Sequence, residues 1–279
     1  MNTKKAEFRI LMICLKFMSM SGTTDKIGVV ILAAGQGTRM KSELPKVMHK
    51  LAGRPMIDYV VAAVESAGHH TKNFSVVAGI KPVVVVSPTN HLAREFLGAR
   101  VDYAIQEKQL GTGHAVACAE KILNGFVDHV MVFYGDHPYL KSESIKRLMK
   151  RHVERGNTVT LMTAVVPDFE GWRAPFYDFG RVIRGANGHV AEIVERKDAN
   201  EEELKTKEIN PSYFCFKADW LWKNLKELKN NNAQKEYYLT DLVKQAIDAG
   251  EKISSIEIEP AEALGVNSQD DLKLAHDIK

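Results

Sequence analysis

The sequence predicts an α/β protein with a mostly parallel, mixed sheet flanked by helices. Short apolar runs alternate with amphipathic segments between residues 29 and 133, as expected when crossover helices join parallel strands. A glycine-rich loop follows the first apolar run, and open α/β sheets place their ligands at such strand ends. Beyond about residue 155, short strands and a hairpin signal replace the regular alternation. We therefore expect the second half of the same domain to contain a mixed set of strands.

The individual elements follow from periodicity and from the residues that end them. Apolar residues at 56, 57, 60, 61 and 64 share one helical face, and Gly68 is a suitable stop. The turn Gly185-Ala-Asn-Gly188 predicts a hairpin, and the alternation over 253–258 predicts a half-exposed strand. We expect helices at 55–67, 91–97, 220–228, 240–249 and 270–278, with another beginning at 111. Strands are expected at 29–32, 83–86, 101–105, 130–133, 158–165, 182–184, 190–194, 213–216 and 253–258.

Length and composition fit an ordinary globular protein. The 279 residues are 45% hydrophobic and 26% charged, and we assign residues 27–279 to one domain. The net charge of +3 is small, so we expect neither a nucleic-acid nor a membrane partner. The three cysteines, at 14, 118 and 215, lack metal-ligand spacing, which favours buried thiols in a reducing cytoplasm. The oligomeric state stays open, and a homo-oligomer is possible.

The first 26 residues are expected to form an extension without a role in the chemistry. The apolar stretch 8–20 is interrupted by Arg9 and Lys16 and is too short to span a bilayer. We expect it to be disordered or loosely attached, or to reflect a start codon assigned too early, with Met18 or Met20 as the true beginning.

A loop of small residues after the first apolar run predicts a nucleotide site. Ala33, Ala34 and Gly35 follow Leu32, so backbone N–H groups can approach a phosphate or a base closely. Two cations, Arg39 and Lys46, follow within a few residues. A dinucleotide fingerprint is excluded because its third glycine is replaced by Met40, and the Walker motif is absent. An ordinary tight turn between a strand and a helix is the alternative interpretation.

Two further stretches offer polar groups at strand ends. Gln106 could present its side-chain amide to the edge of a pyrimidine while Gly111 and Thr112 bring backbone groups beside it. Asp136 ends an apolar strand, where a carboxylate beside phosphates usually holds Mg²⁺. The alternatives are a glycine-rich helix start for the first stretch and a turn or N-cap aspartate for the second. His137 is interpreted as a turn residue.

These stretches together resemble the sugar-1-phosphate nucleotidyltransferases, and more closely the uridylyltransferase domain of bacterial N-acetylglucosamine-1-phosphate uridylyltransferases. The resemblance covers 27–279 and has no counterpart of the C-terminal β-helix acetyltransferase domain, so it implies the nucleotidyl half of that activity alone. It rests on the strings LAAGQGTRM, LPKVMHKLAGRPM, QLGTGHAV, YGD, GRVI, IVERKDA, EIN, NNAQKEYYLTD and GVN.

The resemblance implies a Rossmann-like nucleotidyltransferase fold and a role for each matching residue. Arg39 and Lys46 would act on the phosphates as catalytic residues, and Asp136 with Asn267 would hold Mg²⁺. The nucleotide-binding residues would be Leu32, Ala33, Ala34, Gly35, Gly37, Gln106, Gly111 and Thr112. The sugar-binding residues would be Tyr134, Gly135, Gly180, Glu195, Asn210, Tyr238 and Thr240.

Three departures from the family pattern affect these expectations. Pro211 and Ser212 follow Asn210 where the family usually has a small residue and a glycine. His137 replaces a small or apolar residue after the aspartate. The stretch 68–79 resembles an insertion in a connection that is normally short.

The reaction implied by the resemblance is Mg²⁺-assisted, in-line transfer of a uridylyl group from UTP to N-acetylglucosamine 1-phosphate. Its products would be UDP-N-acetylglucosamine, a peptidoglycan precursor, and pyrophosphate. One alternative is a nucleotidyltransferase for glucose 1-phosphate or for dTTP or CTP. Another is a non-catalytic nucleotide-sugar sensor that keeps the fold.

Overall fold

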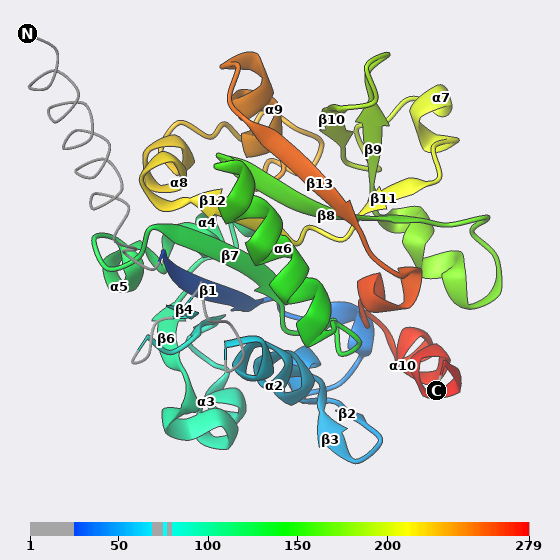
Figure 1. Cartoon of the computed structure of the whole chain (residues 1–279). Helices are drawn as coiled ribbons and strands as arrows, with labels where there is room; N and C mark the ends of the chain where they lie inside the picture. The colour runs from blue at the N-terminus through cyan, green and yellow to red at the C-terminus, as the bar shows by residue number, and fades with distance from the viewer. Residues whose placement is uncertain (1–24, 69–74, 77–79, 279) are drawn as a thin grey trace, which may run out of the picture.

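An eleven-stranded mixed sheet organises the chain, as the computed structural model in Figure 1 shows. The structure describes residues 25–68, 75–76 and 80–278. The strand order is β10-β9-β11-β8-β12-β7-β1-β5-β6, while β13 pairs with β8 and β4 pairs with β1. The strands are β1 (Lys26–Ala33), β4 (Ser75–Val76), β5 (Val83–Val86), β6 (Asp102–Ile105), β7 (His129–Tyr134), β8 (Val159–Val165), β9 (Gly180–Arg184), β10 (Val190–Val194), β11 (Glu208–Asn210), β12 (Phe214–Lys217) and β13 (Ile253–Glu257). A separate two-stranded ribbon joins β2 (Lys50–Leu51) to β3 (Arg54–Pro55).

The parallel core predicted from the sequence is confirmed. Strand β1 lies between β5 and β7 and is parallel to both, with Val30 opposite Val83 on one side and Val132 on the other. The second half adds antiparallel pairs, including β12 with β7 and β9 with β10. The carboxyl ends of β1 and β7 therefore meet at one edge of the sheet, with Leu32 opposite Tyr134.

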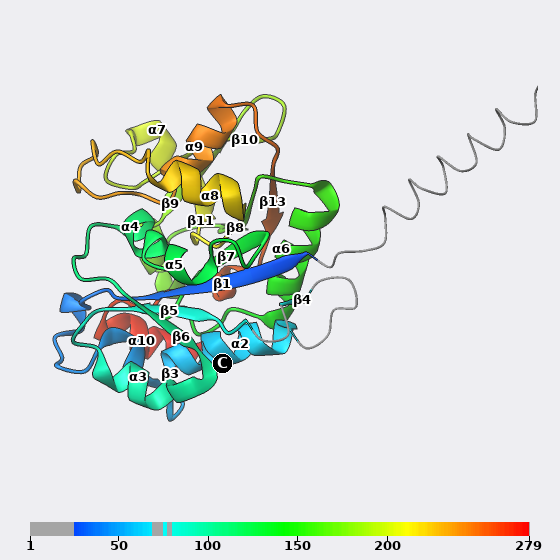
Figure 2. The ribbon, with the colours of Figure 1, turned by 90° about the vertical axis from the view of Figure 1, so that its left-hand side faces the viewer.

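Helices cover both faces of the sheet, as Figures 1 and 2 show. Alternate residues of β1 point into two hydrophobic clusters, with Val29 and Ile31 in one and Val30 and Leu32 in the other. The first cluster contains residues of α2, α6 and α10, and the second contains residues of α4, α5, α8 and α9. The helices are α2 (Met56–Gly68), α3 (His91–Leu97), α4 (Thr112–Ala117), α5 (Glu120–Leu123), α6 (Ser142–Arg155), α7 (Glu201–Leu204), α8 (Ala218–Leu225), α9 (Asp241–Asp248) and α10 (Gln269–Asp277).

Most predicted elements are present, with several differences. Helix α6, the longest in the described part of the chain, was not predicted although Ile145, Leu148 and Met149 share its buried face. The segment Glu208–Asn210, which was not among the predicted strands, forms β11 between β8 and β9. The predicted helix 220–228 is shifted and spans Ala218–Leu225.

Two expectations concern residues that are mostly outside the described ranges. Of the extension 1–26, residues 1–24 are not described, and Lys26 already belongs to β1. Of the suspected insertion 68–79, the described part consists of Gly68, which ends α2, and β4, which pairs with β1. Within the part of the chain that the structure describes, no helix combines the length and apolarity needed to cross a membrane.

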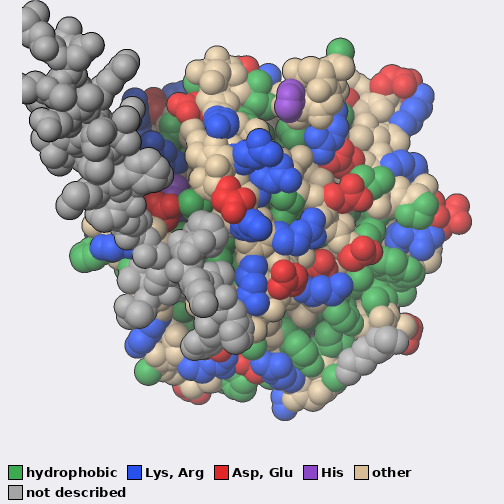
Figure 3. Space-filling model, in the orientation of Figure 1, with side chains coloured by type: hydrophobic (Ala, Val, Ile, Leu, Met, Phe, Trp, Pro, Cys, Tyr) green, Lys and Arg blue, Asp and Glu red, His purple; other side chains and the backbone are tan. Residues whose placement is uncertain are grey.

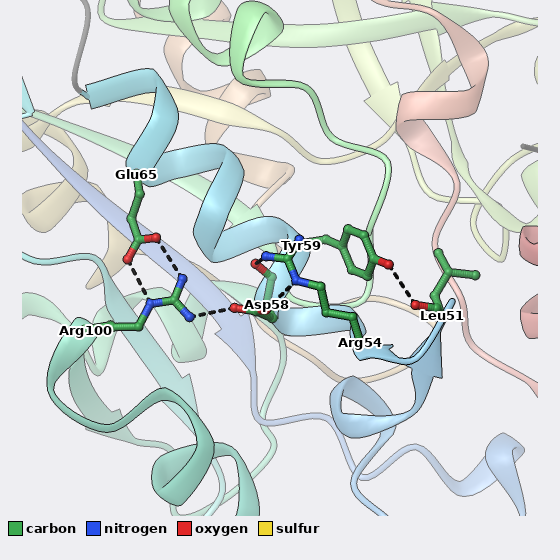
Figure 4. Close-up of polar contacts among 6 residues, drawn as sticks. All are labelled: Leu51, Arg54, Asp58, Tyr59, Glu65 and Arg100. Carbon is green, nitrogen blue, oxygen red and sulfur yellow. Dashed lines mark hydrogen bonds and ion pairs between the residues drawn. The ribbon is translucent and has the colours of Figure 1, made fainter.

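Acidic and basic side chains are interspersed over the face of the molecule drawn in Figure 3, in keeping with the small net charge. One network of these charges is partly buried and joins three elements (Figure 4). Asp58 of α2 accepts from Arg54 in β3 and, at 2.6 Å, from Arg100, which follows α3. Arg100 also binds Glu65, two turns further along the same face of α2, at 2.7 and 3.1 Å.

We expect Asp58→Asn to destabilise the protein by about 1–3 kcal/mol at pH 7, because two partly exposed guanidinium groups lose a buried charged partner. Burial raises the pKa of Asp58, but Arg54 and Arg100 lower it more, so the net pKa lies below its ordinary value of 3.8. A depressed carboxyl pKa stabilises the fold above the unfolded-state pKa, and this stabilisation is lost as the pH falls through the folded-state pKa.

Urea denaturation of both proteins at pH 7 and pH 3 measures this contribution. The stability gap between them should narrow at pH 3. Glu65→Gln, at a more exposed partner of the same arginine, is the matched control and should cost less than about 1 kcal/mol. A gap at Asp58 that is constant between the two pH values would contradict the assignment.

Candidate active site

Two adjoining pockets lie at the carboxyl ends of β1 and β7. Both are lined by Lys46, Thr112, Tyr134, Asp136 and Glu236, so they share a wall of polar groups. The first pocket is also lined by Leu32, Ala33, Ala34, Gly35, Val47, Gln106, Gln109, Gly111 and Ala115. The second pocket is also lined by His137, Phe179, Gly180, Glu195, Asn210, Pro211, Ser212, Gln234, Tyr238 and Asn267.

The first pocket brings together seven of the eight predicted nucleotide-binding residues. Gln106 is 3% exposed, and its amide nitrogen donates to the Gly111 carbonyl at 3.2 Å and lies 3.1 Å from His114 Nδ1. These contacts leave the amide oxygen as the group that can accept from a ligand. Gln109 also lines the pocket and was not predicted, although it stands in the same string of residues.

Backbone geometry explains the glycines of this pocket. Gly111 has φ 109° and ψ 176°, a conformation that is essentially restricted to glycine. A Cβ there would lie 2.7 Å from the backbone nitrogen and oxygen of Tyr237, which itself bonds to Leu110 and Gly113 at 2.8 Å. Gly37, the eighth predicted residue, does not line the pocket. Its φ is 63° and a Cβ would meet that of Lys46 at 2.7 Å, so Gly37 allows the loop to pack against Lys46.

Lys46 joins the two predicted metal ligands. It begins the 3₁₀ turn η2 (Lys46–Met48), and its ammonium lies 2.5 Å from Asp136 Oδ2 and 2.9 Å from Asn267 Oδ1. The Val266 N–H donates to the Asp136 carbonyl at 2.9 Å, which brings the segment before α10 to this point. Asp136 and Asn267, which the resemblance pairs at one metal ion, therefore meet around one cation.

The charge of Asp136 is retained despite its burial. The residue is 4% exposed, and burial alone would raise its pKa. The positive charge of Lys46, with a smaller effect from His137, outweighs burial and holds the pKa below its ordinary value. The site therefore carries a buried carboxylate at neutral pH.

Polar groups from three strands converge in the second pocket. Gly180 begins β9, Glu195 follows β10 and Asn210 ends β11. Burial raises the pKa of Glu195, and a hydrogen bond from Thr240, 2.9 Å from Oε1, opposes that shift. Thr240 thus lies behind Glu195 and does not line the pocket.

Two further predicted sugar-binding residues, Tyr134 at the end of β7 and Gly135 directly after it, differ in position. Burial raises the pKa of Tyr134, which lines both pockets, while the side chains of Ser212 and Thr112 lower it through hydrogen bonds. Gly135 lines neither pocket. It packs against Val47, whose Cγ1 would lie 3.2 Å from an added Cβ.

His137, interpreted as a turn residue, is buried and lines the second pocket. Its Nδ1 lies 2.7 Å from the hydroxyl of Tyr213, which donates to the Glu262 carbonyl at 2.8 Å. Because that hydroxyl has one proton, His137 must donate to it from Nδ1. Burial lowers the pKa of His137 to about 4, so the ring is neutral at pH 7. A Cβ at Gly265 would lie 2.5 Å from Nε2, so the glycine makes room for the ring.

Arg39 lies apart from Lys46. Its side chain is 64% exposed, with Nη1 3.9 Å from Asp178 Oδ2, and it lines a third pocket beside the second. Arg196 and Lys197 line the same pocket, and Arg196 Nε lies 3.2 Å from the other oxygen of Asp178. The role predicted for Arg39 on the departing phosphates stays a prediction.

A family model described as the MobA-like NTP transferase domain matches residues 29–237, which include β1, β7 and most of both pockets. The chain belongs to this family. Members of the MobA-like NTP transferase family are nucleotidyltransferases. The matched segment contains every residue that lines the first pocket and all residues of the second pocket except Tyr238 and Asn267.

Similar proteins include two curated relatives named "Bifunctional protein GlmU". The one from Clostridium botulinum is 41% identical over 250 residues, covering 89% of this chain and 51% of the relative. The one from Brevibacillus brevis is 44% identical over 246 residues, covering 88% and 50%. The chain thus spans about half the length of the curated relatives it matches.

A solved structure of a candidate glucose-1-phosphate thymidylyltransferase from Bacillus anthracis, with sucrose bound, superposes with a TM-score of 0.69. It covers 90% of this MobA-like NTP transferase and 94% of that chain at 17% sequence identity. At this identity the likeness concerns the fold, and it confirms the predicted nucleotidyltransferase architecture of a parallel core flanked by helices.

We expect Gly111→Ala to weaken both the fold and nucleotide binding, because the new methyl group would meet the backbone of Tyr237. Gly53→Ala is the matched control: Gly53 has φ 83°, but an added Cβ meets nothing within 4 Å. The control should lose about 1–2 kcal/mol from the backbone conformation alone, and Gly111→Ala should lose more. Urea denaturation and calorimetric titration with UTP measure both effects. If Gly111→Ala lost no more stability than Gly53→Ala and kept the wild-type affinity for UTP, this account of the loop would be contradicted.

Proposed function

We propose that the protein transfers a uridylyl group from UTP to N-acetylglucosamine 1-phosphate and releases pyrophosphate. One observation carries the proposal: the cluster of Lys46, Asp136 and Asn267 lies where the first and second pockets meet. A reaction between two phosphate compounds needs a pocket for each and positive charge between them. Identity of 41–44% to relatives named "Bifunctional protein GlmU" supports this specificity.

The two pockets suit the two substrates in different ways. The first has backbone of small residues and the Gln106 amide oxygen, which can accept the N3–H of a uracil ring. The second has Glu195 and Asn210, whose oxygens and amide can bind the hydroxyl and acetamido groups of a sugar. We assign UTP to the first pocket and the sugar phosphate to the second.

The reaction is a single in-line displacement. An oxygen of the sugar phosphate forms a bond to the α-phosphorus, and the bond from that phosphorus to the bridging oxygen breaks, which releases pyrophosphate. The attacking oxygen is already an anion, so it requires no general base. Lys46 would bind the phosphates at the point of attack and reduce the repulsion between two polyanions.

The residues present fit Mg²⁺. Asp136 and Asn267 offer one carboxylate and one amide oxygen that already surround a cation, the ammonium of Lys46. Hard oxygen ligands are those that Mg²⁺ prefers, and it is commonly bound by one or two carboxylates together with substrate phosphates. The bound ion would add positive charge at the phosphate oxygens.

A pyrophosphate-release assay over a panel of nucleotides and sugar phosphates tests the proposal. The highest kcat/KM is expected with UTP and N-acetylglucosamine 1-phosphate, compared with dTTP, CTP and glucose 1-phosphate. Asp136→Asn should lower kcat at least about a hundredfold, because the charge that would hold the metal is lost. Asp219→Asn, on the exposed surface of α8, is the control and should keep full activity. Turnover that persists in Asp136→Asn or without Mg²⁺ would overturn the metal assignment. The absence of turnover with every pair of nucleotide and sugar phosphate would favour a non-catalytic sensor.

The sugar assignment has its own test at Glu195. We expect Glu195→Gln to raise the KM for the sugar phosphate about ten- to a hundredfold and to leave the KM for UTP unchanged, because a hydrogen bond to a charged group is lost. Glu192→Gln, on β10 and paired with Lys244 at 3.7 Å, is the neighbouring control. Steady-state kinetics with each substrate varied in turn separates the two effects. An equal rise in both KM values would show that Glu195 does not belong to a sugar pocket.

A further inference from the structure

Ser212 has a backbone conformation that L-residues rarely adopt. It lies between β11 and β12 with φ 60°, in the left-handed region where a side chain crowds the following carbonyl. Glycine would avoid this cost, and non-glycine residues in such conformations concentrate at functional sites. The presence of serine here in place of glycine therefore suggests a functional role for the Ser212 side chain.

Ser212 holds the amide of Asn210 from two directions. The Ser212 N–H donates to Asn210 Oδ1 at 3.0 Å, and Asn210 Nδ2 donates to Ser212 Oγ at 3.2 Å. Asn210 is 3% exposed, so these contacts fix its amide in the floor of the second pocket. Asn210 keeps one N–H and one lone pair for a ligand.

The Ser212 hydroxyl is itself accessible from the second pocket. Ser212 is half-buried and lines that pocket with Asn210, Glu195 and Gly180. Because its oxygen accepts from Asn210, its own proton is available to an acceptor. An oxygen atom of a ligand in the second pocket can be that acceptor.

We propose that Ser212 is a specificity-determining residue of the second pocket, donating its hydroxyl proton to the acetamido carbonyl oxygen of the sugar phosphate. The inference rests on the proposed function. The two hydrogen bonds with Asn210 hold the Ser212 hydroxyl beside the Asn210 amide, so the two residues form a donor pair. A sugar with a hydroxyl group in place of the acetamido group lacks that carbonyl oxygen and loses the contact.

Two substitutions at Ser212 separate recognition from backbone strain. Ser212→Ala removes the hydroxyl and keeps the strained backbone, whereas Ser212→Gly removes both. Ala52→Gly is the matched control, because Ala52 has φ 50° in the exposed turn between β2 and β3, away from both pockets. Melting temperature, steady-state kinetics and calorimetric binding of N-acetylglucosamine 1-phosphate and glucose 1-phosphate are measured for all four proteins.

Both Ser212 variants should reduce the preference for the N-acetylated sugar, measured as the ratio of kcat/KM values, about tenfold, with an unchanged KM for UTP. Ser212→Gly and Ala52→Gly should both raise the melting temperature, and Ala52→Gly should keep the wild-type preference. A preference that is unchanged in Ser212→Ala would overturn the inference and leave Ser212 with a structural role.

Failure of the proposed function gives a different result. A wild-type protein that uses another sugar 1-phosphate shows that the proposed substrate is wrong, and it also overturns the acetamido contact. A wild-type protein that binds the N-acetylated sugar phosphate without turnover shows that the proposed reaction is wrong. The contact is then supported if Ser212→Ala weakens that binding about tenfold and overturned if the affinity is unchanged.

Discussion

The ion pair between Lys46 and Asp136 is the interaction on which the rest of the site depends. Asp136 is buried, and a buried carboxylate without a partner would be expelled or protonated. Lys46 supplies that partner and also binds Asn267, which lies 221 residues further along the chain. The loop after β1, the end of β7 and the segment before α10 are therefore held at one point. Lys46 and Asp136 also line both pockets, so the ion pair lies where the two pockets meet.

The sequence predicted those parts of the structure that depend on short-range patterns. The spacing of apolar residues and the turn residues were sufficient to predict β1, β5, the hairpin of β9 and β10 and several helices. Each such pattern reflects a buried face of the element. The approach of Asn267 to Asp136 came from the family resemblance, since one asparagine after a strand carries no signal of its own. Helix α6 was missed because its charged residues outnumber its apolar residues, although the apolar residues have helical spacing.

The site residues show where sequence reasoning ends. Gly37, Gly135 and Thr240 belong to the predicted set, yet each lies behind a pocket-lining residue and shapes its position. A motif indicates which residues are near the chemistry, but which of them face the pocket depends on packing with distant elements. The burial of His137 likewise requires Tyr213, which immediately precedes β12, and the space left by Gly265. Neither contact has a local pattern in the sequence.

The position of Asn267 also decides when the cation site can exist. A ribosome that adds about 5–20 residues per second needs on the order of ten seconds to pass from Asp136 to Asn267. During that interval the emerging chain can form the parallel core and the loop after β1, but the third side chain of the cluster has not been made. The centre that joins the two pockets is thus completed only after the strands of the parallel core have been made.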